Sequence, residues 1–268
     1  MAENELPEIT PSIADVTCPS GLSGRIRRLR IKDLDILSST VKAKDGGNVD
    51  AFLASAWTGL VDHGPYQQPW VDFSNGVRWP QVLSGDRTWV LLALRIITCG
   101  PMFHFRITCR QTRCGHQYDS AVDLGRVGFH GMSPEAAASL ACGQNVHYRV
   151  LPLSQRRVGF RLLTGEDDVR QARVLAENPE NLVTAITLMR LEEIDGATSP
   201  SERRRFVTEM DVEDSEWLTA EWEAADVWVD QMIETTCPQC ARTSSLVIPF
   251  DSDFFSRRSS RPRSISAR

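Results

Sequence analysis

The sequence lacks any apolar run long enough to cross a bilayer. A membrane-spanning helix needs about 20 consecutive apolar residues, and the longest run here, Trp89–Ile97, is interrupted by Arg95. The opening stretch MAENELPEIT is acidic and polar, whereas a secretion signal begins with basic residues followed by an apolar segment. We therefore expect a protein without a membrane anchor that is cytoplasmic when made.

The common catalytic motifs are also missing. There is no GxxxxGK[ST] phosphate loop, no GxGxxG after a strand, no HExxH and no GxSxG. Histidine is scarce, with five in 268 residues, and these side chains are scattered along the chain. Glu166, Asp167 and Asp168 are adjacent carboxylates, but they stand in the first turn of a predicted helix, where the helix dipole favours acids without catalysis. The sequence predicts no catalytic residue, no small-molecule substrate and no enzyme activity.

The chain has no excess of positive charge. Its 30 Lys and Arg residues face 35 Asp and Glu residues, which gives a formal net charge of −5. Composition therefore does not indicate a general affinity for nucleic acid. Basic residues gather in two places, with five in the segment 25–32 and five arginines, unaccompanied by acids, in 257–268.

Cysteine is present, and in an odd number. Seven cysteines in a reducing compartment favour metal ligands and buried thiols over a disulfide framework. Two pairs occur, one in FRITCRQTRCGHQYDSAVDL (105–124) and one in IETTCPQCARTSSLVIPF (233–250). Apolar and polar residues alternate on both sides of each pair, which predicts two β-hairpins with cysteines in their turns. We interpret Cys18, Cys99 and Cys142, which have no close cysteine neighbour, as ordinary buried or tail residues.

Two such hairpins can deliver four ligands to one metal ion. Structural zinc takes four thiolate or imidazole ligands in a tetrahedron, and tight turns supply them in pairs. We predict that one structural Zn²⁺ is bound in a zinc ribbon by Cys109, Cys114, Cys237 and Cys240. Two alternatives stay open, namely that His116 replaces Cys114 and that the four cysteines are free thiols. A redox pair would need a helix N-terminus, and catalytic zinc would need an open coordination position, so neither fits the pattern.

Hydrophobic periodicity predicts an α+β fold, a zinc-ribbon-like pair of β-hairpins with a helical insertion and N-terminal helices. Helical spacing occurs in NVDAFLASAWTGL and TWVLLALRIIT, in two segments split near Asn178-Pro179, and after Asp211. A further hairpin is predicted in HYRVLPLSQRRVGFRLL, and SPSERRRF is interpreted as a basic connector. We divide the chain into a flexible arm (1–20), an N-terminal helical region (21–101), two halves of a zinc ribbon (102–124 and 229–250), a hairpin plus helical insertion (125–228) and a disordered basic tail (254–268).

The segment GLSGRIRRLRIKDLDIL combines basic residues with apolar residues at roughly helical spacing. An acidic stretch precedes it and Asp45-Gly-Gly follows it, so we predict an amphipathic helix or strand that docks on an acidic partner surface. The alternative is that it packs on its own domain as a first core helix. The predicted partner-binding residues are Leu22, Arg25, Ile26, Arg28, Leu29 and Arg30.

Several short motifs follow one another along the chain, namely CPSGLSGRIRRLRIKD, GDRTWVLLALRIITCGPMFHFRITC, RRVGFRLLTGEDD, and CPQC followed by IPF and FF. In this order they resemble the T-even-type bacteriophage baseplate hub proteins, also called baseplate hub assembly chaperones, over most of residues 18–255. The resemblance implies a non-enzymatic structural or assembly role in a contractile tail, with other hub or tail proteins as partners. It also implies either incorporation into a phage-like particle or a role confined to assembly. Many relatives have two CxxC pairs, from which the Cys109-x4-Cys114 spacing departs.

A zinc-ribbon adaptor that binds nucleic acid is the alternative function. Arg110, Arg113 and the arginine-rich tail would then contact phosphates. The hairpins lack a dense basic and aromatic face, and the net charge is negative. Both features favour protein partners over nucleic acid.

Overall fold

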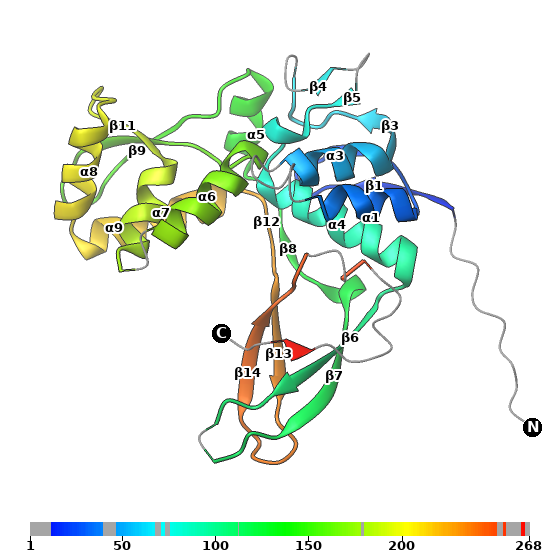
Figure 1. Ribbon diagram of the computed structural model, residues 1–268. Helices are drawn as coiled ribbons and strands as arrows, with labels where there is room; N and C mark the ends of the chain where they lie inside the picture. Colours follow the sequence, from blue (N-terminus) through cyan, green and yellow to red (C-terminus); the bar gives the residue numbers. More distant parts are fainter. Residues whose placement is uncertain are drawn as a thin grey trace, which may run out of the picture.

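The computed structural model describes residues 12–39, 47–67, 71–72, 76–111, 113–177, 180–250, 254–255 and 264–265. The fold is α+β, as predicted, and its sheets are small, with two or three strands each. Figure 1 shows three parts, an N-terminal part on the right, a helical part on the left and a ribbon of hairpins that projects below them. Within the described ranges, no helix combines the length and the apolar character needed to cross a membrane.

The N-terminal part packs a three-stranded antiparallel sheet, in the order β1-β2-β3, against helices. The buried helix predicted before Gly100 is present as α4, and its side chains Val90, Leu94 and Ile97 belong to the core. The elements of this part are β1 (Ile13–Thr17), β2 (Ser23–Arg27), α1 (Ile31–Leu37), α3 (Gly47–Ala56), β3 (Trp57–Asp62), β4 (Val71–Asp72), β5 (Gly76–Val77), η1 (Trp79–Gln81) and α4 (Ser84–Cys99).

Two predictions for this part are wrong. Strand β1 lies inside the stretch predicted to be a flexible arm, and β2 and β3 lie inside the region predicted to be helical. In β2, Gly24 and Ile26 are buried and alternate with arginines, which is the period of a strand. A Cβ atom on Gly24 would come within 2.1 Å of the Trp57 ring, so glycine is required for β2 and β3 to approach.

The ribbon consists of two antiparallel hairpins, as predicted. Strand β6 (Met102–Thr108) pairs with β7 (Gln117–Asp123), and β13 (Met232–Thr236) pairs with β14 (Thr243–Val247). Every second residue of β6 from Phe103 to Ile107 is buried, which is the alternation expected of a strand with one solvated face. Between the hairpins, the Thr235 hydroxyl donates a hydrogen bond to the Ser120 hydroxyl, with 3.1 Å between the oxygens.

The tail predicted to be disordered begins with two buried side chains. The Phe254 ring lies 5.0 Å from the Phe103 ring, and the Phe255 ring lies 5.0 Å from the Phe52 ring, measured between centroids. Strand β15 (Ser264–Ile265) pairs in parallel with β6. The prediction is therefore wrong for these four residues, and the rest of 254–268 lies outside the described residues.

The insertion between the hairpins contains the predicted β9–β10 hairpin and the predicted helices α6, α7 and α9. The predicted connector SPSERRRF forms part of helix α8, and Pro200 is accommodated in its first turn, where the missing N–H leaves no helical bond unmade. The elements are η2 (Leu124–Arg126), β8 (Phe129–His130), α5 (Pro134–Ala141), β9 (His147–Val150), β10 (Arg157–Phe160), α6 (Gly165–Glu177), α7 (Leu182–Arg190), β11 (Leu191–Ile194), α8 (Pro200–Glu209), α9 (Val212–Ala225) and β12 (Trp228–Val229).

Candidate metal centre

The four cysteines predicted to bind metal meet at the free end of the ribbon. Cys109 and Cys114 lie in the loop between β6 and β7, and Cys237 and Cys240 lie in the loop between β13 and β14 (Figure 1). The Cys109 and Cys240 sulfurs are 3.6 Å apart, and the Cys114 and Cys237 sulfurs are 3.9 Å apart. All four sulfur atoms lie within 4.8 Å of one another.

These distances fit four ligands around one metal ion. A tetrahedral ion with metal–sulfur bonds of about 2.3 Å places its sulfur ligands about 3.8 Å apart. A disulfide would need a sulfur–sulfur distance of about 2.05 Å, and all seven cysteines of the chain are free. The four cysteines therefore form a possible tetrahedral metal site.

Backbone hydrogen bonds shape the first cysteine loop. The Cys109 N–H donates to the His116 carbonyl, with 2.8 Å between nitrogen and oxygen, which continues the β6–β7 ladder. The Cys114 N–H donates to the Gln111 carbonyl across 2.9 Å and forms a tight turn. Arg113 has φ of 76°, and the chain then turns again at Gly115 with φ of 59°. The left-handed conformation of Arg113 lets the longer x4 spacer return Cys114 to the side of Cys109.

Backbone hydrogen bonds also shape the second cysteine loop, in which two residues separate Cys237 and Cys240. The Cys237 N–H donates to the Arg242 carbonyl, and the Ala241 N–H donates to the Cys237 carbonyl, each across 2.9 Å. Ala241, directly after the last cysteine, has φ of 56°, a conformation that side-chain-bearing residues adopt infrequently. In both loops a residue in the left-handed region follows the second cysteine of the pair, and this residue ends the turn.

The surroundings of the sulfurs favour a negative charge on Cys237. Burial raises the pKa of the Cys237 thiol, but the backbone N–H groups of Cys240 and Gln239 and the adjacent thiols lower it by more. The net effect is a lowered pKa of about 7. The N–H of Gln111 lowers the pKa of Cys109, whereas burial and the other three thiols raise it, to about 12. The Cys237 thiolate thus forms readily, whereas the raised pKa of Cys109 keeps its proton in place until a cation neutralises the site.

His116 does not join the cluster. Its ring stacks on the Tyr118 ring at a centroid distance of 6.2 Å and an angle of 8°. Among the described residues, the group that could hold a metal ion comprises the four cysteines. The alternative in which His116 replaces Cys114 is therefore not supported by the geometry.

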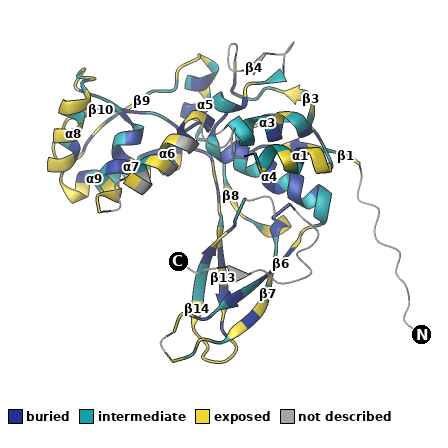
Figure 2. Ribbon diagram, viewed as in Figure 1, coloured by how far each residue is buried: buried dark blue, intermediate teal, exposed yellow. Residues whose placement is uncertain are grey.

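The chemistry available at this site follows from its ligand set. Four sulfur ligands complete a tetrahedron, so a bound ion would have no open position for water or substrate. Cys109 and Cys237 are buried, Cys114 is half-buried and Cys240 is exposed, and Figure 2 shows exposed residues around the loops at the ribbon end. The site can therefore hold two hairpins together, and its ligand set is not suited to metal-activated hydrolysis.

The predicted docking segment lies largely within the N-terminal part. Leu22 and Ile26 are fully buried in the core, and Leu29 packs against it. Our expectation that these apolar side chains depend on a partner for their burial is wrong, because α4 and the rest of the N-terminal part already cover them. The Leu29 N–H also donates to the Thr98 hydroxyl at the end of α4, across 3.0 Å.

The basic residues of the same segment are placed differently. An Arg28 guanidinium nitrogen lies 3.3 Å from the Thr98 carbonyl, to which it donates. Arg25 makes an exposed contact of 3.5 Å with Asp15 on the neighbouring strand β1, and Arg30 is exposed. The role of these arginines toward a partner stays a prediction.

The adjacent acids at the start of α6 make structural contacts. Arg161 pairs with Asp167, at 2.6 Å from one of its guanidinium nitrogens, and the Thr164 N–H donates to the same carboxylate. Asp168 accepts from Arg87 on α4 across 3.0 Å. Asp167 and Asp168 thus have structural partners, and the Asp168 contact ties α6 to the N-terminal part.

A buried polar cluster around Asp86 was not predicted from the sequence. The Tyr66 hydroxyl donates to the Asp86 carboxylate across 2.5 Å, and the Ser20 N–H donates to it across 3.1 Å. Burial raises the pKa of Asp86 to about 6, although these donors oppose the increase. Nothing in the local sequence pattern indicated the cluster, because its members come from three separate segments.

Comparison of the chain with protein-family models, with curated proteins and with solved structures found no match.

Proposed function

We propose that this protein is a non-enzymatic structural or assembly component whose ribbon is closed by one structural Zn²⁺. The observation that carries the proposal is the cluster of four sulfurs at tetrahedral spacing at the ends of two hairpins. An all-sulfur tetrahedral site suits zinc, and a closed shell leaves zinc a structural role. The ion replaces the protons of the thiols, so binding is tighter at higher pH.

Elemental analysis tests the zinc proposal directly. Protein purified without chelator should contain one zinc and no stoichiometric iron per chain, and Cys237→Ser should reduce the zinc content to well below one. Cys142→Ser is the matched control, because Cys142 is exposed and lies outside the cluster. Zinc well below one per chain in the unaltered protein, with the same melting temperature for Cys237→Ser, would show that the site does not hold a structural metal.

We further propose that the protein acts in the baseplate hub of a contractile, phage-like tail, as a hub component or as its assembly chaperone. Support comes from the ordered motifs of residues 18–255 and from the structural contacts of Asp167 and Asp168, two of the three adjacent acids. On this proposal the protein is made in the cytoplasm, and its partners are other hub or tail proteins.

Affinity purification from particle-producing cells tests the hub proposal. Hub or tail proteins should co-purify with the tagged chain, and analysis of mature particles should show whether the chain is retained in them. The absence of every tail protein from the purified material would contradict the proposal.

The nucleic-acid adaptor remains the second candidate, favoured by the exposed Arg110 and Arg113 beside the cysteines. A gel-shift titration with duplex DNA at two salt concentrations distinguishes it. Phosphate binding must weaken steeply with salt, and we expect no shift at physiological salt. A saturable, salt-sensitive shift that is lost in Arg110→Ala/Arg113→Ala would favour the adaptor.

A further inference from the structure

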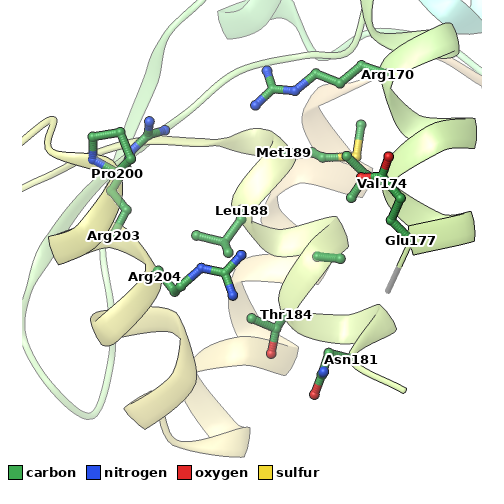
Figure 3. A pocket seen from close by; sticks show the side chains of 11 residues that line it. Arg170, Val174, Glu177, Asn181, Thr184, Leu188, Met189, Pro200, Arg203 and Arg204 are labelled. Carbon is green, nitrogen blue, oxygen red and sulfur yellow. The ribbon is translucent and has the colours of Figure 1, made fainter. Parts of the chain in front are cut away.

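Helices α6, α7 and α8 enclose a cleft with a volume of about 310 Å³. Val174 on α6 and Ala185, Leu188 and Met189 on α7 give it an apolar floor. Figure 3 shows the guanidinium groups of Arg170 and Arg204 reaching from α6 and α8 into the space between the helices. The cleft is thus apolar at its base and basic at its rim.

Two of the three arginines that line the cleft are not neutralised by described residues of the chain. Arg170 and Arg204 are exposed, and neither makes an ion pair with a described residue. Arg203 donates to the Leu191 carbonyl through one terminal nitrogen, which also lies 3.6 Å from a Glu192 carboxylate oxygen, while its Nε atom is buried without a hydrogen-bond partner in the described structure. Glu177 is the one carboxylate in the described lining, so the two unpaired guanidinium groups, of Arg170 and Arg204, share the cleft with a single acid.

This combination selects a particular ligand chemistry. Guanidinium groups bind carboxylates through paired, charge-assisted hydrogen bonds. The apolar floor favours an aliphatic side chain, and a volume near the lower limit for ligand pockets admits only one or two side chains. The ligand that fits is an acidic peptide segment in which glutamates flank a leucine or isoleucine.

We propose that the cleft, termed here the arginine cleft, binds residues 1–11 of a second copy of this chain. This stretch, MAENELPEITP, carries Glu3, Glu5 and Glu8 together with Leu6 and Ile9, and it contains no Lys or Arg. It lies outside the described residues, shortly before β1. Among the stretches outside the described residues it is the longest, and it combines acids with aliphatic residues. Charge and apolar content therefore both match the arginine cleft.

The positions of β1 and α8 favour a second copy of the chain, rather than the same copy, as the source of the bound segment. Strand β1 and helix α8 lie at opposite ends of it (Figure 1). Eleven extended residues span about 35 Å, which lets the segment reach beyond the body from which it begins. Binding of this segment to the arginine cleft of a neighbour joins copies head to tail, because the two contacting surfaces differ.

A labelled peptide of residues 1–11, added to the full-length chain at a concentration where the chain is monomeric, tests the site. Fluorescence anisotropy should show saturable binding that weakens with salt, and Arg170→Gln/Arg204→Gln should weaken it at least about tenfold. Arg205→Gln is the matched control, because Arg205 lies on the same helix, is exposed and is absent from the lining. A peptide with its three glutamates changed to glutamine should also bind at least about tenfold more weakly.

Three outcomes of this titration would overturn the proposal. They are the absence of peptide binding, equal binding by Arg170→Gln/Arg204→Gln, and complete displacement of the peptide by inorganic phosphate at an ionic strength where chloride has no effect. The last result would indicate a site for small anions.

Sedimentation velocity of the full-length chain tests whether the bound segment belongs to a second copy. Association should increase with protein concentration and be reduced both by Arg170→Gln/Arg204→Gln and by Glu3→Gln/Glu5→Gln/Glu8→Gln. A chain that stays monomeric at all concentrations, or associates equally in these variants, would overturn the assignment to a second copy. All of these variants keep the four cysteines, so their outcome is independent of the zinc proposal.

Discussion

At the scale of single residues, two buried carboxylates have opposite surroundings. Burial raises the pKa of Asp33, but two hydrogen bonds from Arg27, of 2.8 and 2.9 Å, together with further donors lower it to about 2. Asp86 is buried and makes no ion pair with a described residue, and its pKa is raised to about 6. Asp33 therefore stabilises the fold as an anion, whereas Asp86 is held more favourably in its protonated form.

The raised pKa of Asp86 predicts that its contribution to stability decreases with pH. The unfolded chain loses this proton near pH 4 and the folded chain near pH 6, so the contribution declines between these values and is constant above them. The change is about 3 kcal/mol. Urea unfolding between pH 4 and pH 7 should show this decline relative to Asp86→Asn, which does not titrate.

Asp33 gives a control in a different pH range. Its pKa is lowered, so its contribution is present above about pH 4 and is lost as the pH falls toward about 2. Asp33→Asn should therefore keep the pH dependence between pH 4 and pH 6. Parallel stability curves for the unaltered chain and Asp86→Asn across that range would contradict the assignment to Asp86.

At the scale of elements, the short segment of Phe254 and Phe255 joins two parts of the molecule. Phe254 packs on Phe103 at the base of the ribbon, and Phe255 packs on Phe52 of α3. A chain that ends at residue 253 should lose several kcal/mol of unfolding free energy, since removal of one buried phenylalanine costs about 3–5 kcal/mol. Thermal melting compared with a chain that ends at residue 255 isolates these two rings. Equal melting temperatures for the two chains would show that the rings contribute little.

Elements with a local pattern were predictable, and elements defined by distant partners were not. Alternation predicted β6 and β7, and helical spacing predicted α4, because in each case the buried face is visible in neighbouring residues. Strand β2 carries arginines on its exposed face, and its second partner strand, β3, follows only after two helices. Helix α8 contributes one buried residue, Val207, so it has almost no apolar period to detect.

The same division applies to the metal centre. Spacing and alternation identified the four cysteines, because both are properties of short segments. The left-handed conformations of Arg113 and Ala241 had no counterpart in the sequence, because neither is glycine or asparagine. The Asp86 cluster depends on Ser20 and Tyr66, and contacts between separate segments are visible only in three dimensions.

At the scale of the whole molecule, the metal centre and the main core lie at different places. The cysteines occupy the free end of the ribbon, whereas α4 lies in the N-terminal part (Figure 1). Removal of metal by a chelator should therefore loosen the ribbon and leave α4 intact. Hydrogen exchange should become faster in β6, β7, β13 and β14 and stay unchanged in α4. Equal acceleration in both regions would show that the metal supports the entire fold.

The separation of the two cysteine pairs along the chain also determines when the metal site can be completed during translation. Cys109 and Cys114 leave the ribosome long before Cys237 and Cys240, which lie beyond the complete insertion of α5–α9. The first pair alone supplies two of the four ligands, so an ion cannot be fully enclosed until most of the polypeptide has been made. We therefore expect polypeptides whose synthesis stops before residue 237 to hold the first hairpin without the second, with strand edges open to chaperones and proteases.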